Sequence, residues 1–273
     1  MEITQIKFGQ PDEWQAFQLR HPKFIQNLQP LYDTITKIFI REMKSFGPAD
    51  KVVFYLGRLA VEDFNEILLL CGNGFGVGGM KILRGLYERV VTLLYISDNP
   101  SKADDFLYYF KIHQGKYLNH AKDVFPLDAL NLSAEEATEI QSDYETAKGR
   151  YQEVLCKKCG TTRTRNSWSE FDTLSMARKA GIEKLYVPCF FHPTLQVHTT
   201  VASLCSRVKL KGGDGLTFID GPQHNEADFS LNGAHSLILC ALIGVNDYFK
   251  MGLKEEIEKH FRDFQLIWGV KED

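Results

Sequence analysis

The sequence has few features that interrupt a folded chain. It contains nine prolines in 273 residues and no low-complexity tract, which argues against long disordered linkers. The N-terminal residues lack a positively charged start followed by an apolar run, so no signal peptide is predicted. No uninterrupted apolar run approaches the length of about 18 residues that a membrane span needs. These absences predict a soluble cytoplasmic protein with no membrane partner.

A large excess of charge of either sign is also missing. Lys and Arg number 32 and Asp and Glu number 35, which gives a net charge of −3. No global basic surface therefore requires a nucleic acid, although a local basic patch stays open. Six cysteines in a chain without a secretion signal indicate reduced thiols in a cytosolic protein.

The chain does contain a succession of helical patterns. Hydrophobic residues make up 44% of it, enough to bury a sizeable core. They recur at helical spacing along most of the chain, with no convincing alternating strand and no repeat of fixed period. This predicts an all-α fold, a bundle of about eight to ten helices. We expect an N-terminal helical segment over 1–60 and a helical core domain over 61–273, together forming one compact unit.

One helix, at about residues 79–97, organises the predicted bundle. Its apolar positions follow a 3.6-residue period, and they are so numerous that the helix should be buried on most sides. Further helices are predicted over 11–46, 49–71, 101–124, 133–155, 169–180, 187–205, 226–250 and 253–266. Polar loops are expected at 156–168 and 209–225.

Arg84 and Glu88 interrupt the apolar pattern of the central helix. They lie four residues apart and share a stripe with Tyr95, so the two charges can pair. Two interpretations stay open: a structural ion pair that steers helix packing, or a polar cluster at a functional site.

The glycine-rich segment 72–79 formally matches the dinucleotide-binding fingerprint. That fingerprint requires a strand, a helix and a second strand, whereas the next predicted element is another helix. A close-packed junction between two helices is therefore the better interpretation.

Cys156 and Cys159 form the sharpest local pattern, because two thiols three residues apart before a glycine are typical of a zinc knuckle. Cys189 and His192 offer a second pair of ligands at the same spacing. The alternatives are two surface thiols or a redox pair. The surrounding 156–168 loop is basic and contacts either phosphate or solvent.

His198 follows Thr194 by four residues, with Tyr186 just before the predicted helix. A histidine beside a hydroxyl group is either a satisfied core residue or a general acid or base near neutral pH.

Three segments together resemble a bacterial family of unknown function, DUF5677. They are RGLYERVVTLLYISDNP (84–100), SWSEFDTLSMARKAGIEKLY (167–186) and YVPCFFHPTLQVHTTVASL (186–204). The resemblance covers roughly residues 60–205 and implies site residues at Arg84, Glu88, Tyr186, Thr194 and His198. Two departures from the family pattern are the Thr-Thr pair after His198 and the cysteine-containing loop.

At fold level the family is similar to the helical HEPN nucleotide-binding and ribonuclease domains, which act in defence and toxin systems. Those enzymes carry Arg and His on one helix, and that spacing is absent here, so Arg84 and His198 would have to meet in space. This analogy also implies a homo-oligomer.

Three functions remain open. The first is a non-catalytic module of a stress or defence system that binds a protein, nucleic acid or small ligand. The second is a metal-independent ribonuclease or toxin in which His198 is the acid or base and Arg84 the phosphate-binding cation. The third is a zinc-dependent hydrolase; no other cofactor is expected.

Overall fold

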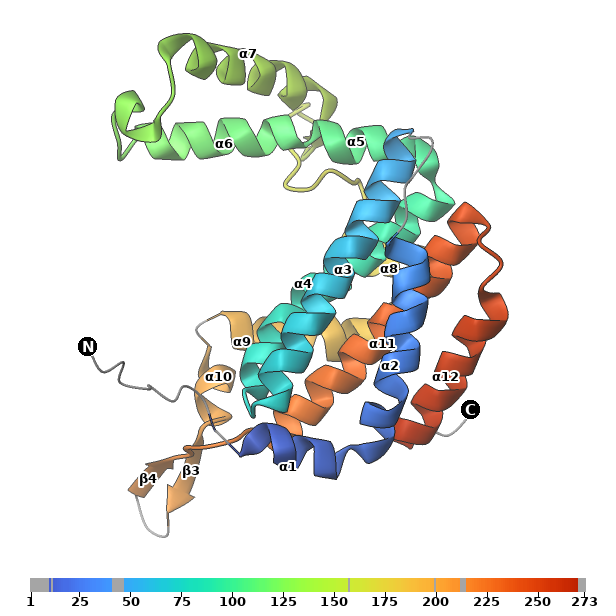
Figure 1. The fold of residues 1–273 in the computed structure, drawn as a ribbon. Coiled ribbons are helices and arrows are strands. Elements are labelled where there is room, and N and C mark those ends of the chain that lie inside the picture. The colour runs from blue at the N-terminus through green and yellow to red at the C-terminus, as the bar shows by residue number, and fades with distance from the viewer. Residues whose placement is uncertain are drawn as a thin grey trace, which may run out of the picture. The chain divides into compact units, whose positions relative to one another are not determined.

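A computed structural model describes residues 10, 12–40, 47–156, 158–198, 200–211 and 215–269, and helices dominate it (Figure 1). The predicted all-α fold is confirmed. The α-helices are α1 (Glu13–Arg20), α2 (Pro22–Phe39), α3 (Pro48–Gly72), α4 (Gly76–Asp98), α5 (Ala103–Tyr108), α6 (Phe110–Lys122), α7 (Ala134–Arg150), α8 (Thr173–Lys179), α9 (His192–Val197), α10 (Val201–Cys205), α11 (His224–Phe249) and α12 (Lys254–Trp268). Shorter helical turns are η1 (Pro100–Lys102), η2 (Leu127–Leu130), η3 (Glu183–Leu185) and η4 (Val187–Phe191).

The chain divides into two compact units. The larger comprises the described parts of 1–46, 50–98 and 173–273, and the smaller comprises 47–49 and 99–172. The larger unit contains α4, α11 and the helices around them, while α5, α6 and α7 belong to the smaller one. The expected boundary at residue 60 falls inside α3, and the division into an N-terminal segment and a core domain stays a prediction.

Helix α4 is the central helix of the larger unit. Leu83, Leu86 and Val90 on this helix have no exposed surface. Helix α11 packs along α4, and α2 and α12 pack against α11. Burying each such side chain contributes about 1.5–3 kcal/mol to the stability of the fold. The α4–α11 pair is therefore the foundation on which the flanking helices are placed.

Glycines at the junction of α3 and α4 and in the first turn of α4 let α4 approach both α3 and α11 closely. Gly74 adopts a φ of +81°, which glycine tolerates without strain. A β-carbon on Gly76 would lie 2.3 Å from the backbone nitrogen of Ala227 in α11. A β-carbon on Gly79 would lie 2.5 Å from the Cys71 sulfur. These glycines serve a tight junction between helices, in line with the interpretation drawn from the sequence.

A buried histidine lies in an aromatic cluster on the other side of α11. The His235 ring is 5.5 Å from that of Phe24 and 5.1 Å from that of Phe264. The Trp268 indole donates a hydrogen bond of 3.2 Å to His235 Nδ1. This bond requires a neutral ring at that nitrogen, and burial lowers the pKa of His235 to about 3.

Acid should therefore destabilise the larger unit in a way that depends on His235. The unfolded chain binds a proton at a pKa of about 6.5, whereas the folded protein resists protonation down to about 3. Stability is present above pH 6.5 and is lost as the pH falls, by about 2 kcal/mol between pH 7 and pH 5. Denaturant unfolding at both pH values measures this loss. A His235→Phe variant should show a smaller loss, and an equal loss in both proteins would contradict the assignment.

Helix α11 is long and apolar enough to cross a membrane by length and composition alone. However, 56% of its most apolar window is buried inside the protein, and its neighbours are α4, α2 and α12. This burial is typical of the core helix of a soluble protein.

In the smaller unit, α6 packs against α7. Ser133 and Glu136 form the predicted capping box at the start of α7. The helix predicted over 101–124 is divided into η1, α5 and α6, with Tyr109 between α5 and α6 keeping a helical backbone of φ −62° and ψ −17°. The Tyr109 hydroxyl donates to the Arg165 carbonyl oxygen at 2.9 Å, so this side chain ties α5 and α6 to the chain that follows α7.

The sequence shows no convincing alternating strand, and the described residues nevertheless form two short hairpins. The helix predicted over 133–155 ends earlier than expected, because α7 stops at Arg150 and β1 (Gln152–Val154) follows. Strand β1 pairs antiparallel with β2 (Thr162–Thr164), which lies inside the predicted 156–168 loop. Strands β3 (Val208–Lys211) and β4 (Gly215–Phe218) pair within and just before the predicted 209–225 loop. Strands of three or four residues are too short to show an alternating pattern in a sequence.

Candidate functional site

Arg84 is the centre of the most distinctive polar cluster in the larger unit. Its Nη1 lies 3.3 Å from Nε2 of His198, and its Nη2 lies 3.9 Å from Oε1 of Glu88 one turn along α4. Its guanidinium carbon lies 5.1 Å from the centroid of the Phe190 ring, within the range of a cation–π contact. Arg84 and His198, which are 114 positions apart in the sequence, therefore lie in contact.

This contact sets the hydrogen-bond roles of the two groups. A guanidinium group only donates hydrogen bonds, so Nε2 of His198 is the acceptor. Glu88 does not reach His198. Burial raises the pKa of Glu88, although Arg84 and Arg89 act in the opposite direction.

A break in the backbone places His198 beside Arg84. The predicted continuous helix over 187–205 was wrong: a π-type turn over η4 runs into α9, which ends at Val197. His198 has an extended backbone with φ −89° and ψ 150°, and Thr200 caps a new helix, α10. Pro193 lies in the first turn of α9, where proline is tolerated. Thr199, the first of the two threonines after His198, lies outside the described residues.

Thr194 and Tyr186, two of the expected site residues, contact Phe190 in the segment before His198 rather than the His198 ring. The Thr194 hydroxyl donates to the Phe190 carbonyl oxygen at 2.6 Å. The Tyr186 ring packs 5.1 Å from Phe190 and 6.3 Å from Tyr87. Thr194 and Tyr186 therefore hold Phe190, the ring against which Arg84 packs. The charged groups and the imidazole of the cluster come from Arg84, Glu88 and His198. Tyr95, expected on the same stripe, is buried in the core.

A cavity of about 770 Å³ opens next to His198. Its lining residues come from the start of α4, from α9 and α10 and from the β3–β4 hairpin, elements that are labelled in Figure 1. Its basic lining residues are Lys81, His198 and Arg207. Amide and hydroxyl groups come from Gln196, Thr200, Ser203 and Gln223, and the apolar walls from Val77, Val197, Val201, Leu204 and Phe218. None of the described lining residues is acidic, so the cavity favours an anion.

Three buried polar atoms, one in the cavity lining and two on α4, have no hydrogen-bond partner among the described residues. Five buried side-chain nitrogen or oxygen atoms in the described part of the chain make no hydrogen bond, and three of them are Arg84 Nε, Tyr87 Oη and Gln196 Oε1. Burial raises the pKa of the Tyr87 hydroxyl. Native proteins leave few buried polar groups unpaired, and functional sites are one place where they do so.

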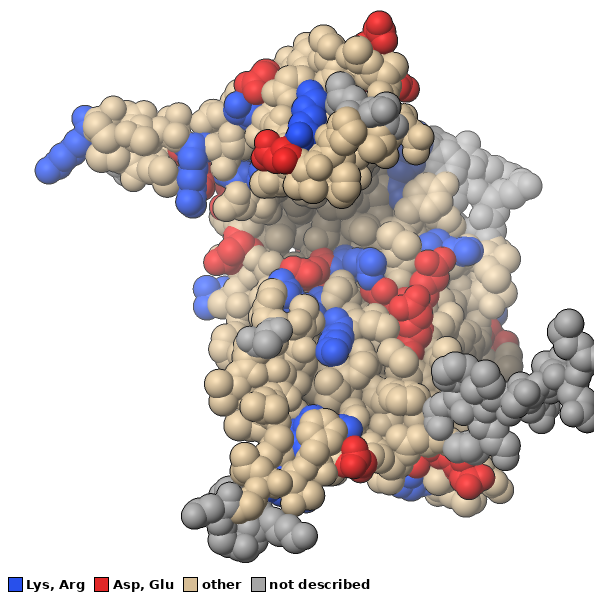
Figure 2. All heavy atoms as spheres, turned by 90° about the vertical axis from the view of Figure 1, so that its left-hand side faces the viewer, with Lys and Arg blue, Asp and Glu red and all other residues tan. Residues whose placement is uncertain are grey.

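The outer surface, unlike the cavity lining, carries charges of both signs. On the face drawn in Figure 2, Lys and Arg side chains are interspersed with Asp and Glu on a largely uncharged surface. The described part of this face has no continuous basic patch. Recognition of an anion would therefore depend on the few cations that line the cavity.

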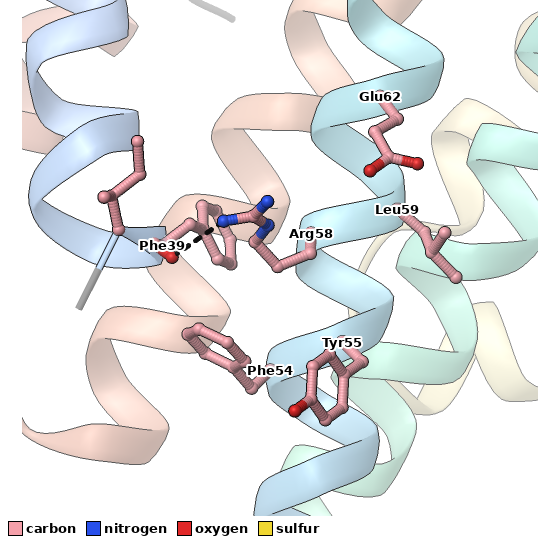
Figure 3. Close-up of a pocket in the computed structure, with 7 residues that line it drawn as sticks. Phe39, Phe54, Tyr55, Arg58, Leu59 and Glu62 are labelled. Atoms are coloured by element: carbon pink, nitrogen blue, oxygen red, sulfur yellow. Dashed lines mark hydrogen bonds between the residues drawn. The ribbon is translucent and has the colours of Figure 1, made fainter. Parts of the chain in front are cut away.

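A second hollow, of about 830 Å³, lies on α2 and α3 (Figure 3). Phe39, Phe54, Tyr55 and Leu59 provide most of its lining. Its one arginine, Arg58, donates a hydrogen bond of 3.1 Å to the carbonyl oxygen of Phe39 (Figure 3). Glu62 also lines this hollow, but none of its described lining residues is a histidine, so it is a weaker candidate for proton-transfer chemistry.

The four expected zinc ligands occupy two different settings. Cys156 and Cys159 flank the tip of the β1–β2 hairpin in the smaller unit, whereas Cys189 and His192 belong to the larger unit. Burial raises the pKa of Cys189 to about 12, and the His192 ring packs 5.0 Å from Phe229. No group of three or more His, Cys, Asp or Glu residues among the described positions is arranged to hold a metal ion. The zinc site stays a prediction.

Two of the four cationic residues in the basic loop around this cysteine pair are paired with carboxylates. Arg163 pairs with Glu153 across the hairpin, and Arg165 Nη1 lies 3.7 Å from Oε2 of Glu170. Lys157 lies outside the described residues. The two arginines are thus engaged with carboxylates, which weakens the case for a phosphate-contacting loop.

Cys159 should be the more reactive of the exposed thiols. Hydrogen bonds from the Thr161 hydroxyl, 2.9 Å away, and from Cys156 lower the pKa of Cys159 to about 7. At pH 7 we expect Cys159 to react with iodoacetamide about threefold to fivefold faster than the exposed Cys205. Peptide mass spectrometry against time measures both rates. A Thr161→Val variant should slow Cys159 alone, and an unchanged rate would contradict this role for Thr161.

Several residues of the site escaped the sequence analysis. Lys81 precedes Arg84 by three positions on α4, so helical spacing alone could have identified it. Gln196, Arg207 and Phe218 carry no motif and meet only because the chain breaks at His198 and folds back through the β3–β4 hairpin.

Comparison with known proteins agrees with the resemblance seen in the sequence. A family model described as a family of unknown function, DUF5677, matches residues 50–215. This match includes Arg84, Glu88, Gln196 and His198. Searches of curated proteins and of solved structures found no match. The matched region covers more than half of the chain, and the protein therefore belongs to the DUF5677 family.

Proposed function

We propose that this protein is a metal-independent ribonuclease that cleaves RNA at the Arg84–His198 pair. The observation that carries the proposal is the 3.3 Å contact between Arg84 Nη1 and His198 Nε2, at the edge of a cavity lined by further cations. An imidazole and a guanidinium in one site supply the two functions that phosphodiester cleavage needs: proton transfer and stabilisation of negative charge.

The residues divide the reaction between them. A phosphate oxygen entering the site would draw the Arg84 guanidinium away from His198, because a charged acceptor binds it more strongly than a neutral ring. Nε2 of His198 would then accept the proton of the ribose 2′-hydroxyl, whose oxygen attacks phosphorus while the P–O5′ bond breaks and the leaving 5′-oxygen takes a proton from water. Glu88 and Phe190 hold Arg84 from two sides. The products would be a 2′,3′-cyclic phosphate and a free 5′-hydroxyl.

The electrostatics of the cavity suit this substrate. Lys81 and Arg207 make no ion pair with a described acidic residue, so their charges are available to a ligand. Val77, in the first turn of α4, also lines the cavity, and the partial positive charge of a helix N-terminus favours anions. We expect binding to weaken as salt is added, because phosphate contacts release counterions.

A non-catalytic binding module is the second candidate. The packing of Arg84 between Phe190 and Glu88 favours it, because the same contacts could serve only to hold α4 against η4 and α9. Either function would fit a cytoplasmic protein of a bacterial stress or defence system, as the family resemblance implies.

Purified protein incubated with short RNA and DNA oligonucleotides tests the proposal. We expect RNA to be cleaved and DNA to stay intact, with equal rates in the presence and absence of EDTA. RNA binding without cleavage would favour the binding module. Activity that is lost in EDTA and restored by zinc would favour the zinc-dependent hydrolase.

A further inference from the structure

Gln196 occupies an unusual position in the cavity beside His198. Its side chain is only 7% exposed, yet it lines the cavity. Its Oε1 atom is buried and has no hydrogen-bond partner. A buried acceptor without a partner destabilises the folded protein, so a ligand that donates a hydrogen bond to it is favoured. If the side chain turns toward the cavity that it lines, this oxygen can accept a hydrogen bond from a ligand with an N–H or O–H group.

The other glutamine of the cavity shows that this arrangement is specific to Gln196. Gln223 Oε1 accepts a hydrogen bond of 2.9 Å from the backbone nitrogen of Val77 and thereby caps the start of α4. Its amide is committed to the fold. Gln196, by contrast, lies on α9 two residues before His198, and no described residue satisfies its oxygen.

The surroundings of Gln196 match a flat, partly apolar ligand that carries a negative charge. Leu204 and Phe218 contribute apolar surface to the same cavity, and the Arg207 guanidinium lies over the Phe218 ring at 5.1 Å. Aromatic rings and stacked guanidinium groups both pack against nucleobases. Lys81 and the nearby Arg84 supply charge for a phosphate.

A carboxamide is suited to reading the edge of a base. It presents one acceptor oxygen and one donor nitrogen side by side. Each nucleobase has an edge with a neighbouring donor and acceptor, and a glutamine that pairs with both atoms of adenine is a recurrent contact. We propose that this cavity binds the nucleobase of a nucleotide, with Gln196 pairing to its edge and the adjoining phosphate at Arg84. This inference rests on the proposed function, because it places the base beside the scissile phosphate.

Binding measurements separate the base from the phosphate. Isothermal titration of adenosine 5′-monophosphate, guanosine 5′-monophosphate and ribose 5-phosphate should show that both nucleotides bind more tightly than the baseless sugar phosphate. In Gln196→Met, nucleotide affinity should fall by about tenfold, while that of ribose 5-phosphate stays unchanged. The same titration with a short RNA shows whether the cavity binds a base within a polynucleotide or the base of a free nucleotide.

A change of preference gives a stricter test than a loss. Gln196→Glu replaces the donor nitrogen with a second acceptor, so it should favour guanine, whose N1–H and N2–H₂ groups both donate. Gln223→Glu is the matched control: it changes a glutamine of the same cavity whose oxygen is already engaged, and we expect no guanine preference. Circular dichroism verifies that each variant is folded.

The outcomes distinguish this inference from the proposed ribonuclease. Base-dependent binding that requires Gln196, in a protein that cleaves no RNA, would support the nucleobase cavity and reject the cleavage. RNA cleavage with equal affinity for ribose 5-phosphate and the nucleotides would overturn the nucleobase cavity alone. A guanine preference in both glutamate variants would also overturn the role of Gln196.

Discussion

Replacing His198 with alanine is expected to lower the rate of RNA cleavage by at least about a hundredfold. The imidazole is the group that would take the proton from the ribose hydroxyl, and its loss leaves water as the only base. The His198 side chain is exposed at the end of α9, and it forms a hydrogen bond with Arg84. The free energy of unfolding should therefore change by less than about 1 kcal/mol. Single-turnover cleavage rates and urea unfolding measure the two quantities.

The matched control is His120→Ala, which removes an exposed histidine from α6 in the smaller unit. We expect it to keep the wild-type rate. Equal rates in the wild type and His198→Ala would remove His198 from the mechanism. A large loss of stability in His198→Ala would instead show that the residue supports the fold, and the binding module would then be preferred.

Replacing Gly76 with alanine is expected to have the largest effect on stability, a loss of about 3 kcal/mol. The added β-carbon would lie 2.3 Å from the Ala227 nitrogen and 2.5 Å from the Gln223 carbonyl oxygen. Both atoms belong to the backbone at the start of α11, so no side-chain rotation can relieve the overlap. The α4–α11 pair would have to separate, and this pair forms the foundation of the larger unit. Urea unfolding of the variant measures the loss.

Gly78→Ala provides the contrast two residues further along α4. A β-carbon there would lie 3.4 Å from the end of the Leu70 side chain and 3.7 Å from the Phe75 β-carbon, both ordinary van der Waals contacts. Alanine also favours a helix over glycine by up to about 1 kcal/mol. We expect this variant to be as stable as the wild type or more so. Equal losses of stability in Gly76→Ala and Gly78→Ala would contradict the conclusion that glycine at position 76 is needed for the close approach of α4 and α11.

The sequence was sufficient to predict the architecture because the helices of this chain are long and regular. The apolar period of α4 and the Ser133–Glu136 capping box both appear where expected. The divisions of the helices were missed at Tyr109 and at His198. At Tyr109 the backbone keeps helical angles between two helices, and after His198 a capping box of Thr200 and Ser203 starts a new helix. Helical propensity does not contain that information.

The functional site was predictable only in part. Arg84 and Glu88 stand out because they are charged in an apolar helix, and His198 because it follows a hydroxyl residue. Their meeting depends on η4 and α9 packing against α4. Gln196 could not be identified, because a glutamine near a helix end is normally a surface residue. Only its burial and its unpaired oxygen single it out.

A DNA oligonucleotide with a single ribonucleotide offers the most direct measurement of the proposed reaction. Only the phosphodiester that follows the ribonucleotide has a neighbouring 2′-hydroxyl. We expect the wild-type protein to cut at that bond alone, to leave a 2′,3′-cyclic phosphate, and to do so equally well in EDTA. An intact oligonucleotide, across several flanking sequences and with the protein in excess, would contradict the proposal. Cleavage at the deoxyribonucleotides as well would show that His198 does not act on the ribose hydroxyl.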